Sequence, residues 1–189
     1  MSFPSLKIGE LMARLPIVQG GMGVGISMSR LASAVASEGG IGVIAGAMAG
    51  MREPDAASDP VGANTRALKR ELEKARSMTN GILGVNIMVA LTTFADMVRT
   101  AVESRADIIF SGAGLPMDLP KIFLDTCEQK KEAFRTKLVP IVSSSRAAAI
   151  IAKKWLQKTG LLPDAFVLEG PRAGGHLGFS KEHIFDSSF

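Results

Sequence analysis

Residues 165–178 read Ala-Phe-Val-Leu-Glu-Gly-Pro-Arg-Ala-Gly-Gly-His-Leu-Gly. An apolar run from Ala165 to Leu168 is followed at once by a Gly-rich turn that carries one imidazole, that of His176. A buried strand that ends in such a turn is typical of the C-terminal edge of a parallel sheet, where α/β barrels place their chemistry. Glycine backbone lets a flat ligand approach closely, and His titrates near neutral pH. The stretch predicts a ligand site with His176 as an acid/base group, and a plain solvated loop is an equally good interpretation of it alone.

Outward from this stretch, short apolar runs alternate with longer helical patterns along the chain. The predicted strands are residues 16–19, 41–45, 84–89, 107–110, 138–142 and 165–168, with helices beginning near residues 27, 64, 93, 119 and 143. The strands are apolar throughout, as expected when both faces of a parallel sheet are covered. One helix between successive strands predicts parallel pairing with right-handed crossovers. We therefore expect a series of six β/α units.

Residues at the ends of the predicted helices indicate where they begin and stop. Ser27 or Ser29 is expected to N-cap the first helix, and Gly39-Gly40 to close it. The last helix repeats apolar residues every four positions, at Ala147, Ile151 and Trp155, which predicts its buried face.

Two architectures share this rhythm, an open doubly wound sheet and a closed TIM (β/α)8-type barrel. The loop 20–25 has several glycines, but in the dinucleotide frame Ile26 stands where Gly or Ala is required, and no acidic residue ends the second strand. Gly-rich and polar residues recur instead after most of the strands, which predicts a ring of loops around one mouth. The sequence favours the barrel, of which it covers about the first six units.

Composition excludes several classes of function. The net charge of +4 is spread along the helices and not gathered into one basic block, so no nucleic-acid partner is expected. No apolar segment approaches the roughly 18 residues of a membrane span, and the N-terminus lacks a signal-peptide pattern. Cys127 is the only cysteine and has no second ligand at metal spacing, so neither a disulfide nor a metal site is expected. These features favour a cytoplasmic protein.

Four segments, in order, are similar to one enzyme family. They are Pro16-Ile-Val-Gln-Gly-Gly-Met-Gly23, Gly84-Val-Asn-Ile-Met88, Ser111-Gly-Ala-Gly-Leu-Pro116 and Ala173-Gly-Gly-His-Leu-Gly178. Together they resemble the FMN-dependent nitronate monooxygenases, formerly 2-nitropropane dioxygenases, a family that also includes flavin-dependent enoyl-acyl carrier protein reductases. The resemblance spans nearly the whole chain.

The resemblance implies an FMN-binding TIM barrel and a set of site residues. Gly21, Met22 and Gly23 would lie against the isoalloxazine ring, Asn86 would hydrogen-bond the flavin, Gly174 and Gly175 would line the pocket, and His176 would be the acid/base group facing the substrate. Without the resemblance, Asn86 is equally well interpreted as a strand-end residue that satisfies loop backbone. Met22 and Met88 have a strong alternative interpretation as core fillers.

The reaction implied by the resemblance is oxidation of an alkyl nitronate by FMN and dioxygen to a carbonyl compound and nitrite. The sister branch passes a hydride from NAD(P)H through FMN to an enoyl thioester. Some nitronate monooxygenases carry a basic residue after the fifth strand, where this sequence has Ser143-Ser144-Ser145, and the difference gives the reductase some weight.

In the family, two further strands follow, and their loops bind the FMN phosphate. Residues 1–189 are therefore expected to be a single FMN-binding barrel domain whose C-terminal portion is missing. An inactive partial barrel is a further alternative. Exposed strand edges at 16–19 and 165–168 would favour self-association into a homo-oligomer.

Overall fold

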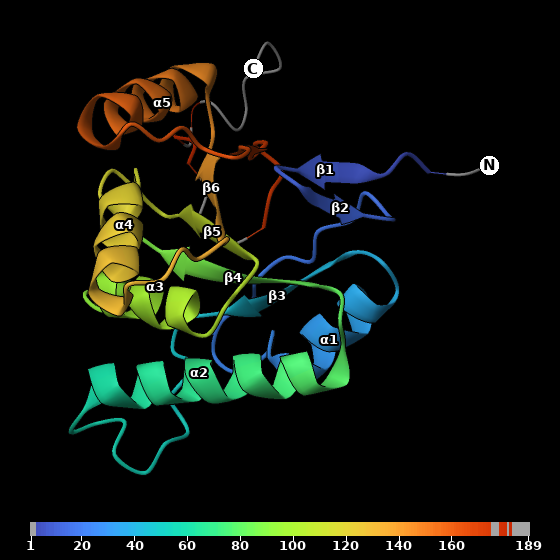
Figure 1. Cartoon of the computed structure of the whole chain (residues 1–189), viewed down its shortest axis with the longest axis vertical. Coiled ribbons are helices and arrows are strands. Elements are labelled where there is room, and N and C mark those ends of the chain that lie inside the picture. Colours follow the sequence, from blue (N-terminus) through green and yellow to red (C-terminus); the bar gives the residue numbers. More distant parts are fainter. Residues whose placement is uncertain (1–2, 175–177, 181, 183–189) are drawn as a thin grey trace.

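The computed structural model describes residues 3–174, 178–180 and 182. A five-stranded parallel sheet runs in the order β3-β4-β5-β6-β7. Its strands are β3 (Ile41–Ala45), β4 (Ile82–Met88), β5 (Ile108–Gly112), β6 (Lys137–Val142) and β7 (Val167–Leu168). The helices are α1 (Ser29–Ser37), α2 (Pro60–Met78), α3 (Phe94–Glu103), α4 (Leu119–Lys130) and α5 (Ser145–Thr159). They follow one another along the outside of the sheet (Figure 1). The chain is an α/β protein that forms a parallel half-barrel of the TIM type, as predicted.

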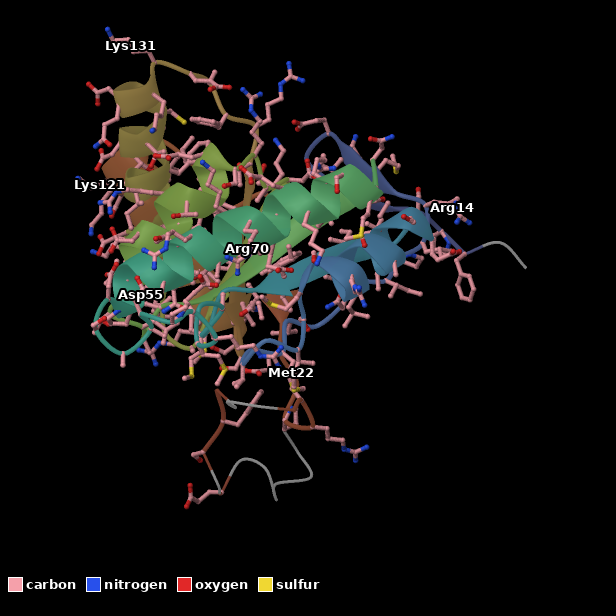
Figure 2. The ribbon with its side chains drawn as sticks, turned by 90° about the horizontal axis from the view of Figure 1, so that it is seen from below. Arg14, Met22, Asp55, Arg70, Lys121 and Lys131 are labelled. Atoms are coloured by element: carbon pink, nitrogen blue, oxygen red, sulfur yellow. The ribbon has the colours of Figure 1, made fainter. Side chains whose placement is uncertain are left out.

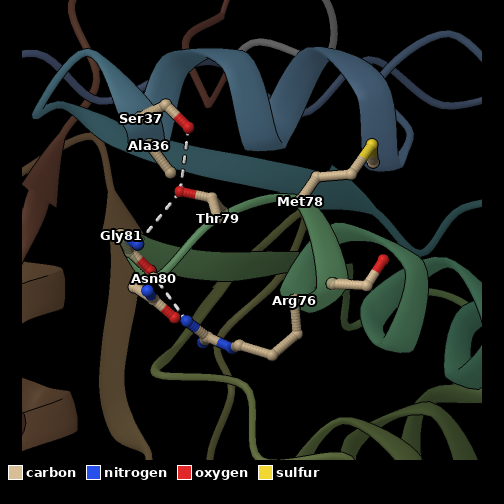
Figure 3. A pocket seen from close by; sticks show the side chains of 8 residues that line it. Ala36, Ser37, Arg76, Met78, Thr79, Asn80 and Gly81 are labelled. Atoms are coloured by element: carbon tan, nitrogen blue, oxygen red, sulfur yellow. Dashed lines mark hydrogen bonds between the residues drawn. The ribbon is translucent and has the colours of Figure 1, made fainter.

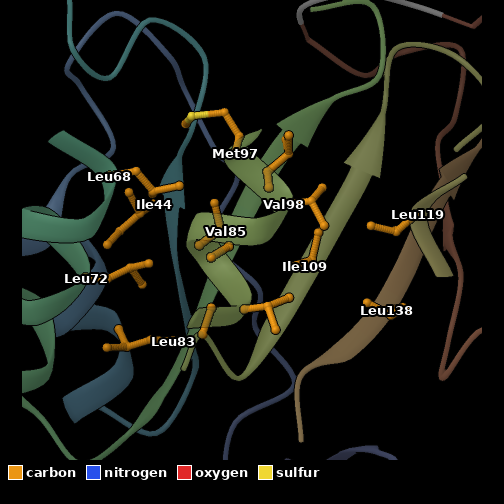
Figure 4. Packing of buried hydrophobic residues seen from close by; sticks show 14 of the residues in the cluster. Ile44, Leu68, Leu72, Leu83, Val85, Met97, Val98, Ile109, Leu119 and Leu138 are labelled. Carbon is orange, nitrogen blue, oxygen red and sulfur yellow. The ribbon is translucent and has the colours of Figure 1, made fainter. Parts of the chain in front are cut away.

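The outer face of the sheet is packed against the helices (Figure 4). This layer consists of fully buried aliphatic side chains, among them Ile44, Leu83, Val85, Ile109 and Leu138 from the strands and Leu68, Leu72, Met97, Val98 and Leu119 from the helices. Burying one such side chain contributes about 1.5–3 kcal/mol. On α5, Ile151 and Trp155 are fully buried, and the Trp155 Nε1 donates to the Pro116 carbonyl at 3.0 Å. The face predicted for this helix is therefore confirmed.

A short antiparallel hairpin covers the inner face of the sheet at the N-terminal end of its strands. Its strands are β1 (Leu6–Ile8) and β2 (Leu11–Ala13), and Ile8 and Ala13 join a second buried cluster with residues of β3, β5 and β6. The Nζ of Lys137, the first residue of β6, lies 2.6 Å from Glu10 Oε2 in the hairpin turn. The hairpin thus occupies the N-terminal end of the strands and leaves the C-terminal end to the loops. It was absent from the predicted elements because strands of three residues carry little pattern.

The first predicted strand is only partly correct. Residues 16–19 run parallel to β3, but Val18 with Ile41 forms a single isolated bridge. The Ile41 N–H donates to the Ile17 carbonyl at 2.9 Å, and the Gln19 N–H donates to the Ile41 carbonyl at 3.0 Å. The next rung is made by a side chain: Gln19 Nε2 donates to the Val43 carbonyl at 3.0 Å, and its Oε1 accepts from the Val43 N–H at 3.3 Å. The Gln19 amide therefore replaces a backbone peptide, which lets the chain leave the sheet at Gly20.

The predicted start of α1 is wrong and its predicted end is confirmed. The N-cap residue is Met28, and neither Ser27 nor Ser29 caps the helix with its side chain. At the other end Gly39 has φ +89°, and the N–H groups of Gly39 and Gly40 bond back to carbonyls of the last turn at 3.1 and 3.2 Å. This is the Schellman arrangement that glycine favours.

Two other helix starts show ordinary side-chain caps. Helix α2 begins at Pro60, earlier than the predicted residue 64, because Asp59 Oδ1 accepts from the Gly62 N–H at 2.9 Å and Pro suits the first helical position. Ser144 Oγ accepts from the N–H of the third residue of α5, within the serine run expected to start that helix. Among the described residues, no helix is long and apolar enough to cross a bilayer.

Candidate active site

The loops that follow the strands begin from one tightly bonded rim. The N–H of Gly46, just after β3, donates to the Asn86 carbonyl at 2.8 Å, and the N–H of Val89, just after β4, donates to the Gly112 carbonyl at 2.8 Å. At the far side of the sheet, the Glu169 N–H donates to the Val142 carbonyl at 2.8 Å. Neighbouring strand ends are thereby held together, so the described loops lie at a common mouth, as the predicted ring of loops requires.

Two of the predicted cofactor residues are in direct contact at this mouth. A Cβ on Gly21 would stand 2.6 Å from the Cβ and 3.2 Å from the Cγ of Asn86. Real Cβ atoms do not approach that closely, so only glycine fits beside Asn86. The loop before α1 therefore lies directly over the inner face of β4.

The Asn86 side chain is half-buried on that inner face, two residues beyond Gly84. Its backbone carbonyl accepts the Gly46 N–H at 2.8 Å, and its side-chain amide has no hydrogen-bond partner among the described residues. The alternative interpretation, in which this amide satisfies loop backbone, is thus not supported there. An amide at the mouth can donate and accept at once, which suits a ligand with mixed polar atoms.

Ser27 holds the loop 20–27 in shape. Its side chain is buried, its Oγ accepts from the Met22 N–H at 2.9 Å, and its hydroxyl lies 3.3 Å from the Gly20 carbonyl. Its own N–H donates to the Met22 carbonyl at 2.9 Å, and its carbonyl accepts from the Ala45 N–H at 2.9 Å. The loop is therefore closed on itself and fastened to the end of β3. We name this set of bonds the Ser27 clasp.

Met22 and Gly23, the other two residues predicted to lie against the flavin ring, lie on the outside of loop 20–27. Met22 is 62% exposed, so its interpretation as a core filler is wrong; Figure 2 shows it at the end of the molecule from which the brown C-terminal segment projects. Gly23 packs on the next loop, where its Cβ would stand 3.0 Å from the Ala47 carbonyl. The N–H of Val24, a non-glycine residue with φ +56°, donates to the same carbonyl at 3.2 Å. Loops 20–27 and 46–59 are thus neighbours at the mouth.

Two side chains that directly follow β6 and β7 bond the backbone of Gly178. Glu169 Oε2 accepts from the Gly178 N–H at 3.1 Å, and Ser143 Oγ donates to the Gly178 carbonyl at 2.9 Å. A Cβ on Gly178 would lie 2.7 Å from Ser143 Oγ, so a larger residue there would displace the Ser143 side chain. Gly174 is exposed, with no described atom within 4 Å of its Cβ position. Gly175 and His176 lie outside the described residues, and their predicted roles stay predictions.

A hollow of about 490 Å³ lies at the opposite end of the sheet, between α1 and the turn before β4 (Figure 3). Three of its polar side chains have partners: Ser37 Oγ donates to Thr79 Oγ1 at 3.0 Å, and Arg76 donates to the Gly81 carbonyl at 2.8 Å and to Asp107 at 2.6 Å. These contacts join α1, α2 and β5, so they are structural. Within the described ranges, no three His, Cys, Asp or Glu side chains are grouped as metal ligands.

A comparison with known proteins matches this arrangement to one family. The family model for nitronate monooxygenase matches residues 5–188. The chain belongs to the nitronate monooxygenase family. Members of this family are flavoenzymes. No curated protein matches the chain.

Three solved structures resemble this nitronate monooxygenase family chain. FabK from Thermotoga maritima is 26% identical to this chain. The match covers 87% of this chain and 43% of the FabK chain, with a TM-score of 0.63. A point variant of the same FabK is 27% identical to this chain. The match covers 86% of this chain and 45% of the FabK variant, with a TM-score of 0.64. A nitroalkane oxidase from Streptomyces ansochromogenes shares the fold at 19% identity and a TM-score of 0.64. The match covers 89% of this chain and 50% of the oxidase. The chain spans about half the length of these proteins or somewhat less.

Sequence reasoning missed the residues that support the site. Gln19, Ser27, Ser143 and Glu169 all bond backbone atoms at or next to the predicted ligand loops. The sequence predicts Ser27 only as a possible helix cap, and its burial within a Gly-rich turn, seen in the structure, identifies it as the clasp. The other three stand directly beside a predicted strand end, where a polar side chain can reach the neighbouring strand.

Proposed function

We propose that this chain belongs to an FMN-dependent oxidoreductase that oxidises alkyl nitronates with dioxygen to a carbonyl compound and nitrite. The observation that carries the proposal is the Asn86 side-chain amide, which stands beside Gly21 at the mouth and is unbonded within the described residues. It comes together with a nitronate monooxygenase family match over residues 5–188. When bound, FMN supplies a two-electron acceptor that dioxygen can reoxidise.

The residues present fit a flavin ring. Gly20 is exposed, with no described atom within 4 Å of its Cβ position. Gly21 has no side chain and packs against Asn86. Flat backbone of this kind suits one face of a ring, and an amide can bond the polar edge of the isoalloxazine. The Ser27 clasp fixes the loop before any ligand arrives, so little ordering free energy is spent on binding. Gly20, Gly21 and Asn86 are thus the residues that would hold the ring.

The proton chemistry is assigned to His176 by resemblance. A neutral nitroalkane must lose an α-proton before it can be oxidised, and an imidazole near neutral pH can accept it. A preformed nitronate has already lost that proton. Ser143 and Glu169 both bond the backbone of Gly178, two residues after His176 in the sequence.

A second candidate is an NAD(P)H-dependent reductase of enoyl thioesters, the sister branch of the family. Two observations favour it. Identity to the FabK variant is 27%, against 19% to the nitroalkane oxidase. In addition, Ser143 stands where some nitronate monooxygenases have a basic residue, and its hydroxyl is engaged with the Gly178 carbonyl.

One set of assays on the purified protein separates the alternatives. FMN binding is measured by quenching of flavin fluorescence, nitronate oxidation by oxygen uptake, and the reductase by NAD(P)H consumption that depends on a short-chain enoyl thioester. Oxygen uptake with an alkyl nitronate supports the first function. Enoyl-dependent NAD(P)H consumption without such uptake selects the second. Absence of FMN binding favours the inactive partial barrel for residues 1–189.

A further inference from the structure

Helix α1 begins directly after the loop of the proposed flavin site, and its start is capped from another helix. Its N-cap residue, Met28, has no polar side chain. The first helical N–H, that of Ser29, donates instead to Glu71 Oε2 of α2 at 3.0 Å. A carboxylate at a helix N-terminus satisfies an orphan N–H and is attracted by the positive end of the helix dipole. Glu71, from a different helix, therefore takes the place of the side-chain cap that Met28 cannot provide.

The capped residue is closely coupled to the Ser27 clasp. Ser29 and Ser27 are both buried, and only Met28 separates them. Ser27 in turn bonds the Met22 backbone and the end of β3. A shift of the first turn of α1 would therefore move the clasp, and with it the Gly21 backbone that lies on Asn86.

Glu71 is not explained by packing or by an ion pair with its neighbour. The buried face of α2 consists of Ala63, Ala67, Leu68, Leu72 and Ala75, and Glu71 is half-buried next to it. Partial burial of a carboxylate costs free energy unless it is hydrogen-bonded. The adjacent Arg70 is engaged with Glu53 at 2.6 Å. The bond to Ser29 is what offsets the burial of this carboxylate.

We propose that Glu71 is a positioning residue for loop 20–27, acting through Ser29 and the Ser27 clasp. The inference rests on the proposed function in one respect: it states that the positioned loop is the one that receives the flavin. Glu71 itself lies on α2 behind the loop and touches no ligand. Its effect on binding is therefore indirect and goes through the geometry of the loop.

The test uses four variants of the whole chain. Glu71→Ala removes the cap, and Glu71→Gln keeps one acceptor oxygen without the charge. Glu73→Gln is the matched control, because Glu73 lies on the same helix with its side chain 64% exposed. Met28→Asp combined with Glu71→Ala restores a cap locally, since Met28 already has the extended backbone (φ −117°, ψ −171°) that N-cap residues adopt.

Two readouts separate positioning from general stability. Amide hydrogen exchange of residues 20–28 is expected to quicken about tenfold in Glu71→Ala, to quicken less in Glu71→Gln, and to return toward wild type in the double variant, with β4 and β5 amides unchanged. FMN affinity is expected to follow the same order. Unchanged exchange in loop 20–28, or equal acceleration across the sheet, overturns the proposal.

Failure of the proposed function is distinguishable from failure of this inference. If no variant, including wild type, binds FMN while exchange in loop 20–28 still responds to Glu71 and is restored through Met28→Asp, the positioning of the loop is upheld and flavin binding by residues 1–189 is contradicted. If FMN binds equally well to all four variants, Glu71 does not position the flavin loop.

Discussion

Gly21 and Asn86, far apart in the sequence, meet so closely that a Cβ on Gly21 would lie 2.6 Å from the Asn86 Cβ. Gly21 belongs to the loop before α1, and Asn86 to the inner face of β4. The contact brings half-buried glycine backbone and a half-buried amide to one place at the mouth of the half-barrel. It explains the glycine at position 21 without any ligand, and it places the amide where a ligand can reach it.

Gly21→Ala is expected to destabilise the fold by about 1–3 kcal/mol, because the added methyl overlaps Asn86. FMN affinity is expected to fall as the loop is displaced. Gly20→Ala is the matched control for stability alone, since its Cβ position has no described neighbour within 4 Å. Thermal unfolding of both variants, with flavin titration of Gly21→Ala, checks this. Equal losses of melting temperature in the two alanines would contradict the contact.

Asn86→Ala is expected to lower FMN affinity about tenfold with little change in stability, because the side-chain amide makes no hydrogen bond within the described residues. A lost hydrogen bond to a bound ligand is commonly worth about 0.5–1.5 kcal/mol. Asn80→Ala, an exposed amide at the opposite end of the sheet, is the control. A large loss of melting temperature with unchanged FMN affinity would show that Asn86 is a structural residue.

Acid is expected to remove the stabilisation that Glu71 provides. Partial burial alone would raise the pKa of Glu71, but hydrogen bonds from the Ser29 hydroxyl and N–H, with Lys74 and Arg70 nearby, leave it below its ordinary value. A lowered pKa means that the stabilisation is fully present above the unfolded-state pKa, about 4.3, and is lost as pH falls through the folded-state pKa. Urea unfolding of wild type and Glu71→Gln from pH 3 to 7 checks this. The stability difference should shrink below about pH 4.3, and a difference that is independent of pH would exclude the charge.

His176→Ala is expected to slow oxidation of a neutral nitroalkane about a hundredfold or more, the usual range for a general acid/base group. Oxidation of a preformed nitronate should fall much less, because its proton has already gone. Steady-state oxygen uptake with both forms of one substrate measures the ratio. Equal losses on the two forms would assign His176 to ligand positioning alone.

Self-association is expected through the two edges of the sheet. Ile17 is 54% exposed beside β3, and Leu168 is 71% exposed in β7 at the other edge. Open apolar strand edges favour pairing with a second copy. Light scattering across a concentration series should show dimers or larger species that Leu168→Lys reduces. A monomer at every concentration would contradict the expectation.

Most secondary structure of this chain could be predicted from the sequence because its signals are local. Residues 41–45 are apolar at every position, and the strand is buried on both faces. Gly39 supplies the positive φ that ends α1. The family motifs likewise located Gly21 and Asn86, since each stands next to a strand end.

Tertiary structure alone decided how those residues are supported. The Gln19 side chain completes a backbone ladder, Glu71 caps a helix other than its own, and the β1–β2 hairpin fills the lower end of the barrel. Each of these depends on strand register and helix packing, which bring together atoms that no local pattern relates. The contact between Gly21 and Asn86 is of the same kind: the sequence named both residues, and only the register of loop over sheet placed one on the other.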